Sequence, residues 1–118
     1  MGTFTLTRSE RIRKSTDFQT VYRTGRKFNS YHFVVLTRKN NLNVTRIGIS
    51  VSKRVGSAVY RNYLKRRIRE AFRLSKKLFK DHTLDLVVIV RKGSSRLRSQ
   101  EMLHELQTIF KVVSSISY

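Results

Sequence analysis

The sequence predicts an α+β domain, in which helices pack against one sheet. Alternating or continuous apolar residues indicate strands over 27–38, 45–52 and 84–91. Apolar residues at helical spacing indicate helices over 16–24, 57–79 and 99–113. The order is helix, two or three strands, helix, strand, helix. The chain has 118 residues, which suits one domain, 1–118, with one core.

The first expected helix has a start signal and a stop signal. Thr16 and Gln19 have capping-box spacing, and Gly25 suits a left-handed stop position. Phe18 and Tyr22 are four residues apart, so we expect them to share one face of the helix.

The strand segments differ in what their two faces carry. In 27–38, Val34 and Leu36 point one way while Phe33 and Val35 point the other, so both faces should be covered. In the strand expected over 45–52, Ile47, Ile49 and Val51 form one face, and the three residues that alternate with them are all small. These small residues are Gly48, Ser50 and Ser52. They predict open space beside this part of the sheet.

The longest helix should begin after Ser57, a suitable N-cap, and reach about Phe79. Its expected packing face consists of Leu64, Ile68, Ala71, Ser75 and Leu78. The opposite face carries Asn62, Arg66, Arg69 and Arg73, with Lys65 and Lys76 at its edge. A basic loop over 91–99 precedes the last helix, whose packing face is Leu103, Leu106, Phe110 and Val113.

Charge is the strongest compositional signal. Lys and Arg total 26 against 7 Asp and Glu, which gives a formal net charge of +19. A surface of this kind repels itself unless an anionic partner neutralises it. Nucleic acid is the leading partner, because each contacted phosphate releases condensed counterions. A merely soluble basic surface is the alternative.

Several features bear on the compartment. The chain has no cysteine, which fits a reducing cytoplasm. Its first residues lack the apolar core of a signal peptide. The longest apolar run, 86–90, is too short to span a bilayer. We therefore expect a cytoplasmic protein with no membrane partner.

The stretch 53–72 is the strongest functional element, because Glu70 is its only acid among many bases. Like charges four residues apart on a helix are destabilising by themselves. Arg69 and Arg73 have this spacing, as do Arg61 and Lys65. Phosphates would relieve the repulsion, and arginine suits forked phosphate contacts. A solvated helix face is the alternative.

This stretch resembles the signature of the bacterial ribonuclease P protein family. The motif reads Arg61, Asn62, Lys65, Arg66 and Arg69 here, after a G-x-x-V segment. The blocks RIRKSTDFQTVYRTG and RIGISVSKRVG, over 11–25 and 46–56, resemble the family's first helix and the strand and loop before the signature. Three blocks in the right order cover nearly the whole chain. Tyr63 departs from the family, which has an arginine there.

The resemblance implies a fold and a function. The fold is an α-β sandwich with a four-stranded mixed sheet and a left-handed βαβ crossover, against the general right-handed rule. The function is that of the protein subunit of ribonuclease P, an endoribonuclease in which the RNA is catalytic. The protein would bind the RNA subunit 1:1, bind the 5′ leader of precursor tRNA, and promote the metal-bound active complex. Mg²⁺ would be held mainly by the RNA subunit, and none by the protein alone.

Two sets of residues follow from these interpretations. Contacts to ribonuclease P RNA are expected from Lys53, Arg54, Arg61, Asn62, Lys65, Arg66, Arg69 and Arg73. For the leader, the resemblance implies a cleft lined by Phe18 and Tyr22 of the first helix with Val34 and Leu36 of the sheet. The residues themselves indicate the same place, since aromatic rings beside small residues such as Ser50 and Ser52 form a stacking platform for unpaired bases. For Phe18 an ordinary place in the core is the alternative, because large aromatic side chains are usually buried.

No catalytic or metal-binding residue is expected in the protein. His32, His82 and His104 are far apart in the sequence and lack metal-ligand spacing. The carboxylates form no recognisable pair for acid–base or two-metal chemistry. A structural ribosomal protein, or a cationic protein active on membranes, remains the rival interpretation. The second rival needs an exposed apolar helix face.

Overall fold

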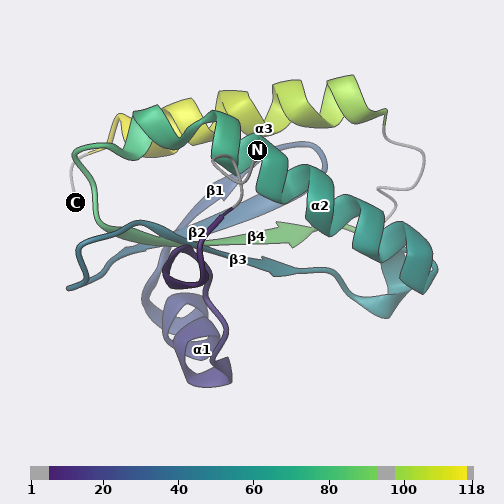
Figure 1. Cartoon of the computed structure of the whole chain (residues 1–118). Helices are drawn as coiled ribbons and strands as arrows, with labels where there is room; N and C mark the ends of the chain where they lie inside the picture. Colours follow the sequence, from purple (N-terminus) through teal and green to yellow (C-terminus); the bar gives the residue numbers. More distant parts are fainter. Residues whose placement is uncertain (1–5, 93–97, 117–118) are drawn as a thin grey trace.

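The computed structural model describes residues 6–92 and 98–116 (Figure 1). The elements are α1 (Ser15–Thr24), β1 (Arg26–Asn29), β2 (Phe33–Lys39), β3 (Arg46–Ser50), α2 (Ala58–Leu74), β4 (Leu84–Val90) and α3 (Ser99–Ser114). Short 3-10 turns cover Arg8–Glu10, Lys53–Val55 and Lys76–Phe79. Most of the basic loop expected over 91–99 lies outside the described residues.

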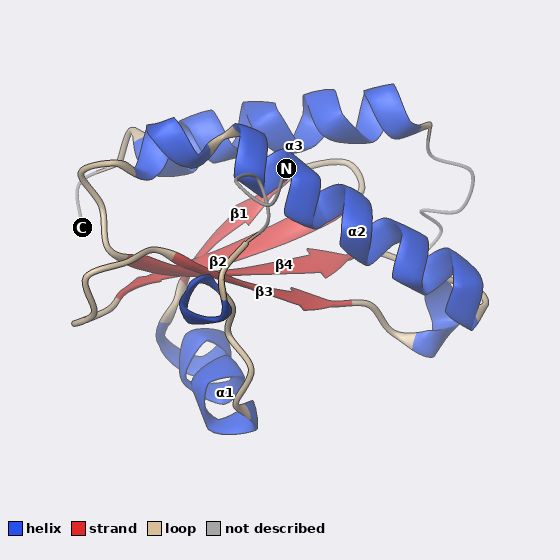
Figure 2. Ribbon diagram, viewed as in Figure 1, coloured by secondary structure: helices blue, strands red, loops and turns tan. Residues whose placement is uncertain are grey.

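The strands form one four-stranded sheet in the order β1-β2-β4-β3 (Figure 2). β2 pairs antiparallel with β1 and with β4, whereas β3 pairs parallel with β4. The predicted α+β class with a four-stranded mixed sheet is therefore confirmed. The β3–α2–β4 connection is the crossover to which the resemblance assigns a left-handed sense, and that sense stays a prediction.

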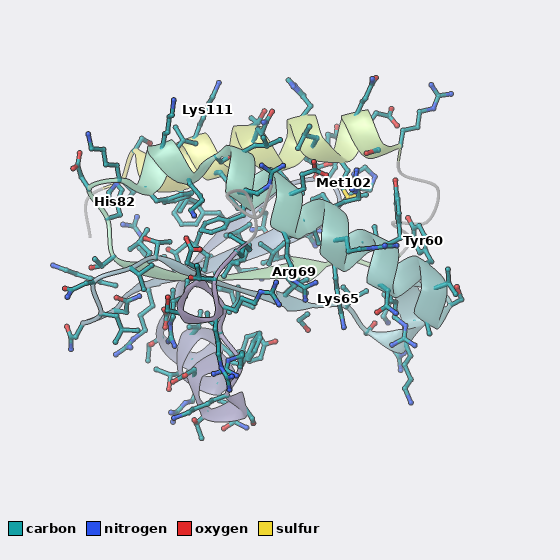
Figure 3. The ribbon with its side chains drawn as sticks, viewed as in Figure 1. Tyr60, Lys65, Arg69, His82, Met102 and Lys111 are labelled. Carbon is teal, nitrogen blue, oxygen red and sulfur yellow. The ribbon has the colours of Figure 1, made fainter. Side chains whose placement is uncertain are left out.

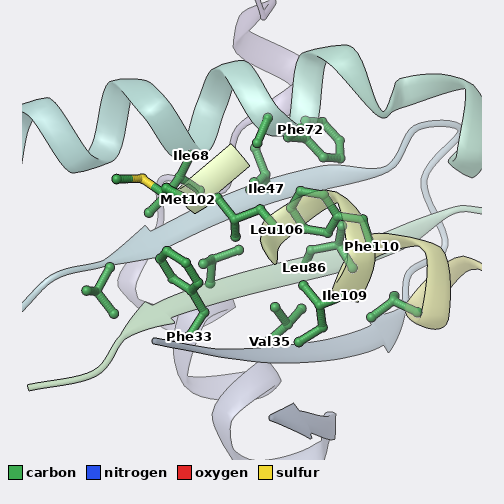
Figure 4. Close-up of a cluster of buried hydrophobic side chains, with 14 of the residues drawn as sticks. Phe33, Val35, Ile47, Ile68, Phe72, Leu86, Met102, Leu106, Ile109 and Phe110 are labelled. Carbon is green, nitrogen blue, oxygen red and sulfur yellow. The ribbon is translucent and has the colours of Figure 1, made fainter. Parts of the chain in front are cut away.

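The sheet is covered on both faces, as the two apolar faces of β2 predict. α1 lies against one face, while α2 and α3 lie against the other (Figure 1). Phe33 and Val35 enter the larger core with Phe72 and Phe110 of the helices (Figure 4). The alternate residues of β2 face α1 and pack in a smaller core around Val21. The two apolar faces of β2 thus contact helices on both sides of the sheet.

The predicted capping box and the predicted left-handed glycine at the ends of the first helix are wrong, although the extent of the helix is close to the prediction. The N-cap position is Lys14, and no side-chain hydrogen bond caps the helix. Gly25 is extended, with φ of −77°, and does not occupy the left-handed region. Close approach explains the glycine, since a Cβ there would lie 2.6 Å from the carbonyl oxygen of Val21.

Two predicted segments are interrupted in the structure. The segment 27–38 forms two strands, because the chain turns at Ser30, whose N–H donates to the Phe33 carbonyl over 2.9 Å. The long helix ends at Leu74 rather than near Phe79, and a 3-10 turn continues it. Among residues 6–92 and 98–116, no helix has the length and apolarity needed to cross a membrane.

Candidate nucleic-acid interface

The orientation of α2 is set by its cap and its apolar face. The Ser57 hydroxyl accepts a hydrogen bond from the N–H of Tyr60 over 3.2 Å, which confirms the expected N-cap. Leu64, Ile68 and Ala71 are fully buried against the core. Burial of this stripe turns the opposite, basic side of the helix toward solvent.

The basic side of α2 borders a hollow of about 530 Å³, which we call the α2 hollow. Its lining residues are Val59, Asn62, Lys65, Arg66 and Arg69. Lys65 and Arg69 extend from α2 on the side of β3 (Figure 3). Among the described residues, the hollow therefore combines three cations, an amide and an apolar side chain, and no carboxylate lines it. This composition suits a polyanion.

A second hollow, of about 180 Å³, lies between α1, β3 and α2, and we call it the β3 hollow. Its lining residues are Arg11, Ile12, Arg13, Phe18, Ile47, Gly48, Ile49, Lys65 and Arg69. Burial, together with the nearby charge of Arg11, lowers the pKa of the Arg69 guanidinium. Like charges converge here, and the lining contains no carboxylate from residues 6–92 or 98–116, so an anion would stabilise the arrangement.

Sequence reasoning missed Arg11 and Arg13. Both precede the first helix, in a segment whose position in the fold no local pattern reveals. The bridge that pairs Arg11 with Ile47 holds this segment along the edge of β3, and the N–H of Ile12 donates to the Ile47 carbonyl over 2.9 Å. The available signal was the run RIRK, which carries three bases.

The remaining predicted contacts to the RNA subunit occupy varied surroundings. Lys53 and Arg54 are exposed in the 3-10 turn before α2. Arg61 is half-buried and its Nε donates to the Gly56 carbonyl over 3.2 Å. Arg73 is half-buried and pairs with Glu70 at 3.3 Å. These two arginines already take part in interactions within the protein.

Tyr63, where the family motif has an arginine, packs along the helix. Its ring stacks near that of Tyr60, with centroids 6.1 Å apart and planes inclined by 22°. The Arg67 guanidinium lies 5.9 Å from the Tyr63 ring centre, within the range of a cation–π contact. Tyr63 also packs against the larger core. The departure from the motif therefore replaces a charge with a packed ring.

The open space expected beside the small residues of β3 is filled by α1 at Gly48. The Phe18 ring lies so close that a Cβ on Gly48 would be 2.7 Å from its Cε1 and Cζ atoms. The Tyr22 ring lies 6.3 Å from that of Phe18, and Tyr22 is 44% exposed. Phe18 is half-buried. The Phe18 ring is therefore packed against the sheet, whereas the Tyr22 ring is exposed to solvent.

The other predicted leader residues differ in accessibility. Val34 and Leu36 are only 9% and 8% exposed, because each packs in the smaller core between α1 and the sheet. Ser50 is half-buried and Ser52 is exposed. Ile89, which sequence reasoning missed, is half-buried and pairs with both Ser50 and Val34 in the sheet register. The sequence did not single it out, because Ile89 belongs to a continuous apolar run, which predicts a strand buried on both faces.

A charged cluster joins the start of α1 to the sheet. Arg46 donates to both carboxylate oxygens of buried Asp85, from Nε over 2.9 Å and from a terminal nitrogen over 2.7 Å. The Asn40 amide donates to the same carboxylate over 2.8 Å. Arg46 also reaches Asp17 of α1 at 3.5 Å. Because Phe18 follows Asp17, this cluster helps to fix the ring on Gly48.

The predicted lack of a metal site can be compared with the described side chains. His32 pairs with Glu105 at 2.7 Å, and the His82 ring bonds to the Ser114 carbonyl over 2.7 Å. His104 is exposed on α3. Within 6–92 and 98–116, no three His, Cys, Asp or Glu side chains are grouped so that they could hold a metal ion.

Comparison with known proteins agrees with this arrangement. The family model described as Ribonuclease P matches residues 6–114. A ribonuclease P protein component from Syntrophus aciditrophicus is 39% identical over 106 residues, covering 90% of this chain and 88% of the relative. One from Syntrophobacter fumaroxidans is 44% identical over 101 residues, covering 86% and 85%.

Solved structures are similar over the same region. The RNase P protein of Staphylococcus aureus has a TM-score of 0.82 and 36% identity, covering 88% of this chain and 94% of that protein. The RNase P protein of Thermotoga maritima has a TM-score of 0.79 and 36% identity, covering 87% and 96%. Sequence signature, fold and relatives agree, and the chain belongs to the bacterial ribonuclease P protein family, the protein component of a ribonucleoprotein endoribonuclease of tRNA processing.

Proposed function

We propose that this protein assists the catalytic RNA in endonucleolytic removal of the 5′ leader from precursor tRNA. It does so by binding the RNA subunit and the leader on adjoining surfaces. The observation that carries the proposal is the β3 hollow, which Phe18 of α1 shares with Lys65 and Arg69 of α2. One side of the hollow continues into the basic face of α2, and the other leads to the rings of α1.

The RNA subunit binds along the basic face of α2. Asn62 and Arg66 are exposed there, and Lys65 and Arg69 line both hollows. Arginine and lysine at these positions contact phosphates and release counterions. Lys53 and Arg54 extend the same basic surface before the helix. The proposed stoichiometry is one protein to one RNA subunit, because the described part of the chain offers one such helix.

The leader binds where α1 meets the sheet. Tyr22 offers an exposed ring beside Phe18, and bases of any sequence stack on an aromatic ring. Ser50 and Ser52 border the same face as small, polar neighbours. Val34 and Leu36 take part mainly by supporting α1. This arrangement suits a single strand whose sequence varies between precursors.

The chemistry belongs to the RNA subunit in this proposal, and Mg²⁺ is bound mainly there. The protein's charge of +19 screens the repulsion between the two RNAs, and the leader contacts favour the metal-bound active complex. We place this work in the cytoplasm, where a bacterial ribonuclease P meets newly made tRNA precursors.

The test is single-turnover cleavage of a precursor tRNA by a bacterial ribonuclease P RNA, with and without this protein, across a magnesium titration. The protein should accelerate cleavage most at low magnesium, because protein and divalent ions screen the same charge. The protein without RNA should cleave nothing. No acceleration at any magnesium concentration would contradict the proposal. An acceleration that stayed constant across the titration would contradict the screening mechanism alone.

A further inference from the structure

The α2 hollow contains one side chain that neither the fold nor phosphate binding explains. Val59 lines it in the first turn of α2 and is 79% exposed. Valine forms helices less readily than alanine, and a valine that is 79% exposed buries little apolar surface. The residue therefore gives the isolated protein no evident stability at this position.

The surroundings of Val59 define what can cover it. Asn62 and Arg66 follow at spacings of three and seven residues, so they lie on the same side of the helix. Lys65 and Arg69 complete the lining, and none of these residues is acidic. An occupant must therefore be strongly anionic and must also present an apolar surface near the start of the helix.

RNA has both properties, because its phosphates are joined through riboses that carry bases. Val59 and Arg66 are seven residues apart, which is about 10 Å along the helix axis. A strand lying along α2 can thus place phosphates beside the cations and a sugar or base against the valine. The exposed Asn62 amide between them has both a donor and an acceptor, which match a ribose 2′-hydroxyl.

We propose that the α2 hollow binds a segment of the RNA subunit in which Val59 packs against a ribose or a base while Lys65 and Arg66 contact the flanking phosphates. This inference rests on the proposed function and deepens it. It assigns to Val59 a contact that does not depend on charge. Binding of the RNA subunit then has a part that salt weakens and a part that salt leaves unchanged.

The test compares Val59→Ala with the wild type over a series of monovalent salt concentrations, using the full chain and a bacterial ribonuclease P RNA. Alanine is the better helix former, so the variant should fold, and circular dichroism checks this. We expect binding about tenfold weaker, or about 1.4 kcal/mol, the scale of two carbon atoms leaving an apolar contact. The slope of log K against log salt should not change.

Two further variants serve as controls. Val112→Ala makes the same substitution at a residue that is 47% exposed on α3, outside both hollows, and should bind like the wild type. Arg66→Ala should instead reduce the slope, by about 0.7 to 0.9 for each phosphate that the shortened side chain no longer reaches.

Each outcome decides the matter. The contact is supported if the plots of log K against log salt for Val59→Ala and the wild type are parallel and the variant binds more weakly at every salt concentration. Coincident lines would overturn it, since the valine would then touch nothing in the complex. A reduced slope for Val59→Ala would also overturn it, because the residue would act through the phosphate contacts. A wild-type protein that failed to bind the RNA would overturn the proposed function and this inference with it.

Discussion

Gly48→Ala tests the packing on which the leader surface depends. The added Cβ would lie 2.7 Å from two atoms of the Phe18 ring and 3.2 Å from Cβ of Ile12. Ordinary contacts begin near 3.4 Å, so the ring must move by about 0.7 Å. Overpacking of this kind costs about 1–3 kcal/mol, and the stiffer unfolded chain offsets about 0.4–1 kcal/mol. The net destabilisation should be about 1–2 kcal/mol.

Thermal unfolding of Gly48→Ala should therefore show a midpoint about 4–8 °C lower. Precursor tRNA should also bind the enzyme assembled with the Gly48→Ala protein more weakly than it binds the wild-type enzyme, because the displaced Phe18 ring disturbs the leader surface. The decisive measurement is a double-mutant cycle with Phe18→Leu, which removes the tip of the ring. In that background Gly48→Ala should cost at least about 1 kcal/mol less. Equal costs in both backgrounds would refute the proposed clash.

Five other substitutions probe the two RNA surfaces and the ion pairs of the fold. Arg69→Ala should lower the salt slope of RNA-subunit binding by about 0.7 to 0.9 in a filter-binding titration, and an unchanged slope would show that Arg69 contacts no phosphate. Tyr22→Ala should weaken binding of precursor tRNA by about 1–3 kcal/mol while binding of mature tRNA is preserved in a folded variant, and equal weakening of both would exclude a leader contact. Asp85→Ala should destabilise the fold by about 3–5 kcal/mol in urea unfolding, since it removes the main partner of Arg46. Asp17→Ala serves as the control, because Asp17 is half-exposed, and it should cost less than about 1 kcal/mol. Burial raises the pKa of the Glu105 carboxyl, but hydrogen bonds from Ser30 and His32 outweigh it and set the pKa below the ordinary value of 4.5. The ionised Glu105 carboxylate therefore stabilises the fold above pH 4.5. This contribution to the free energy of unfolding is lost as the pH falls through the lowered pKa. Glu105→Gln should therefore be less sensitive to acid than the wild type in urea unfolding at about pH 6 and about pH 3, and an identical acid sensitivity would contradict the assignment.

Much of the candidate interface was accessible from the sequence, because helical spacing is a local property. The position of Asn62 and Arg66 opposite Leu64 and Ile68 follows from 3.6 residues per turn, and the structure shows the first two side chains exposed. The cap at Ser57 is local for the same reason. Val34 and Leu36 were placed on the correct face of the sheet, yet their burial depends on α1, which packs across them.

Several features can be read from local sequence alone: the net charge, the alternation in the strands, the periodicity of the helices and the motif that identifies the family. These signals arise from neighbours a few residues apart, whose geometry is fixed by the backbone. Contacts between residues far apart in the sequence came from the packing of the whole fold. This packing brought Arg11 beside Arg69, set the Phe18 ring on Gly48, and paired Arg46 with Asp85. The two members of each of these pairs are between 30 and 58 positions apart in the sequence. Such contacts depend on how sheet and helices pack together, which local periodicity does not encode.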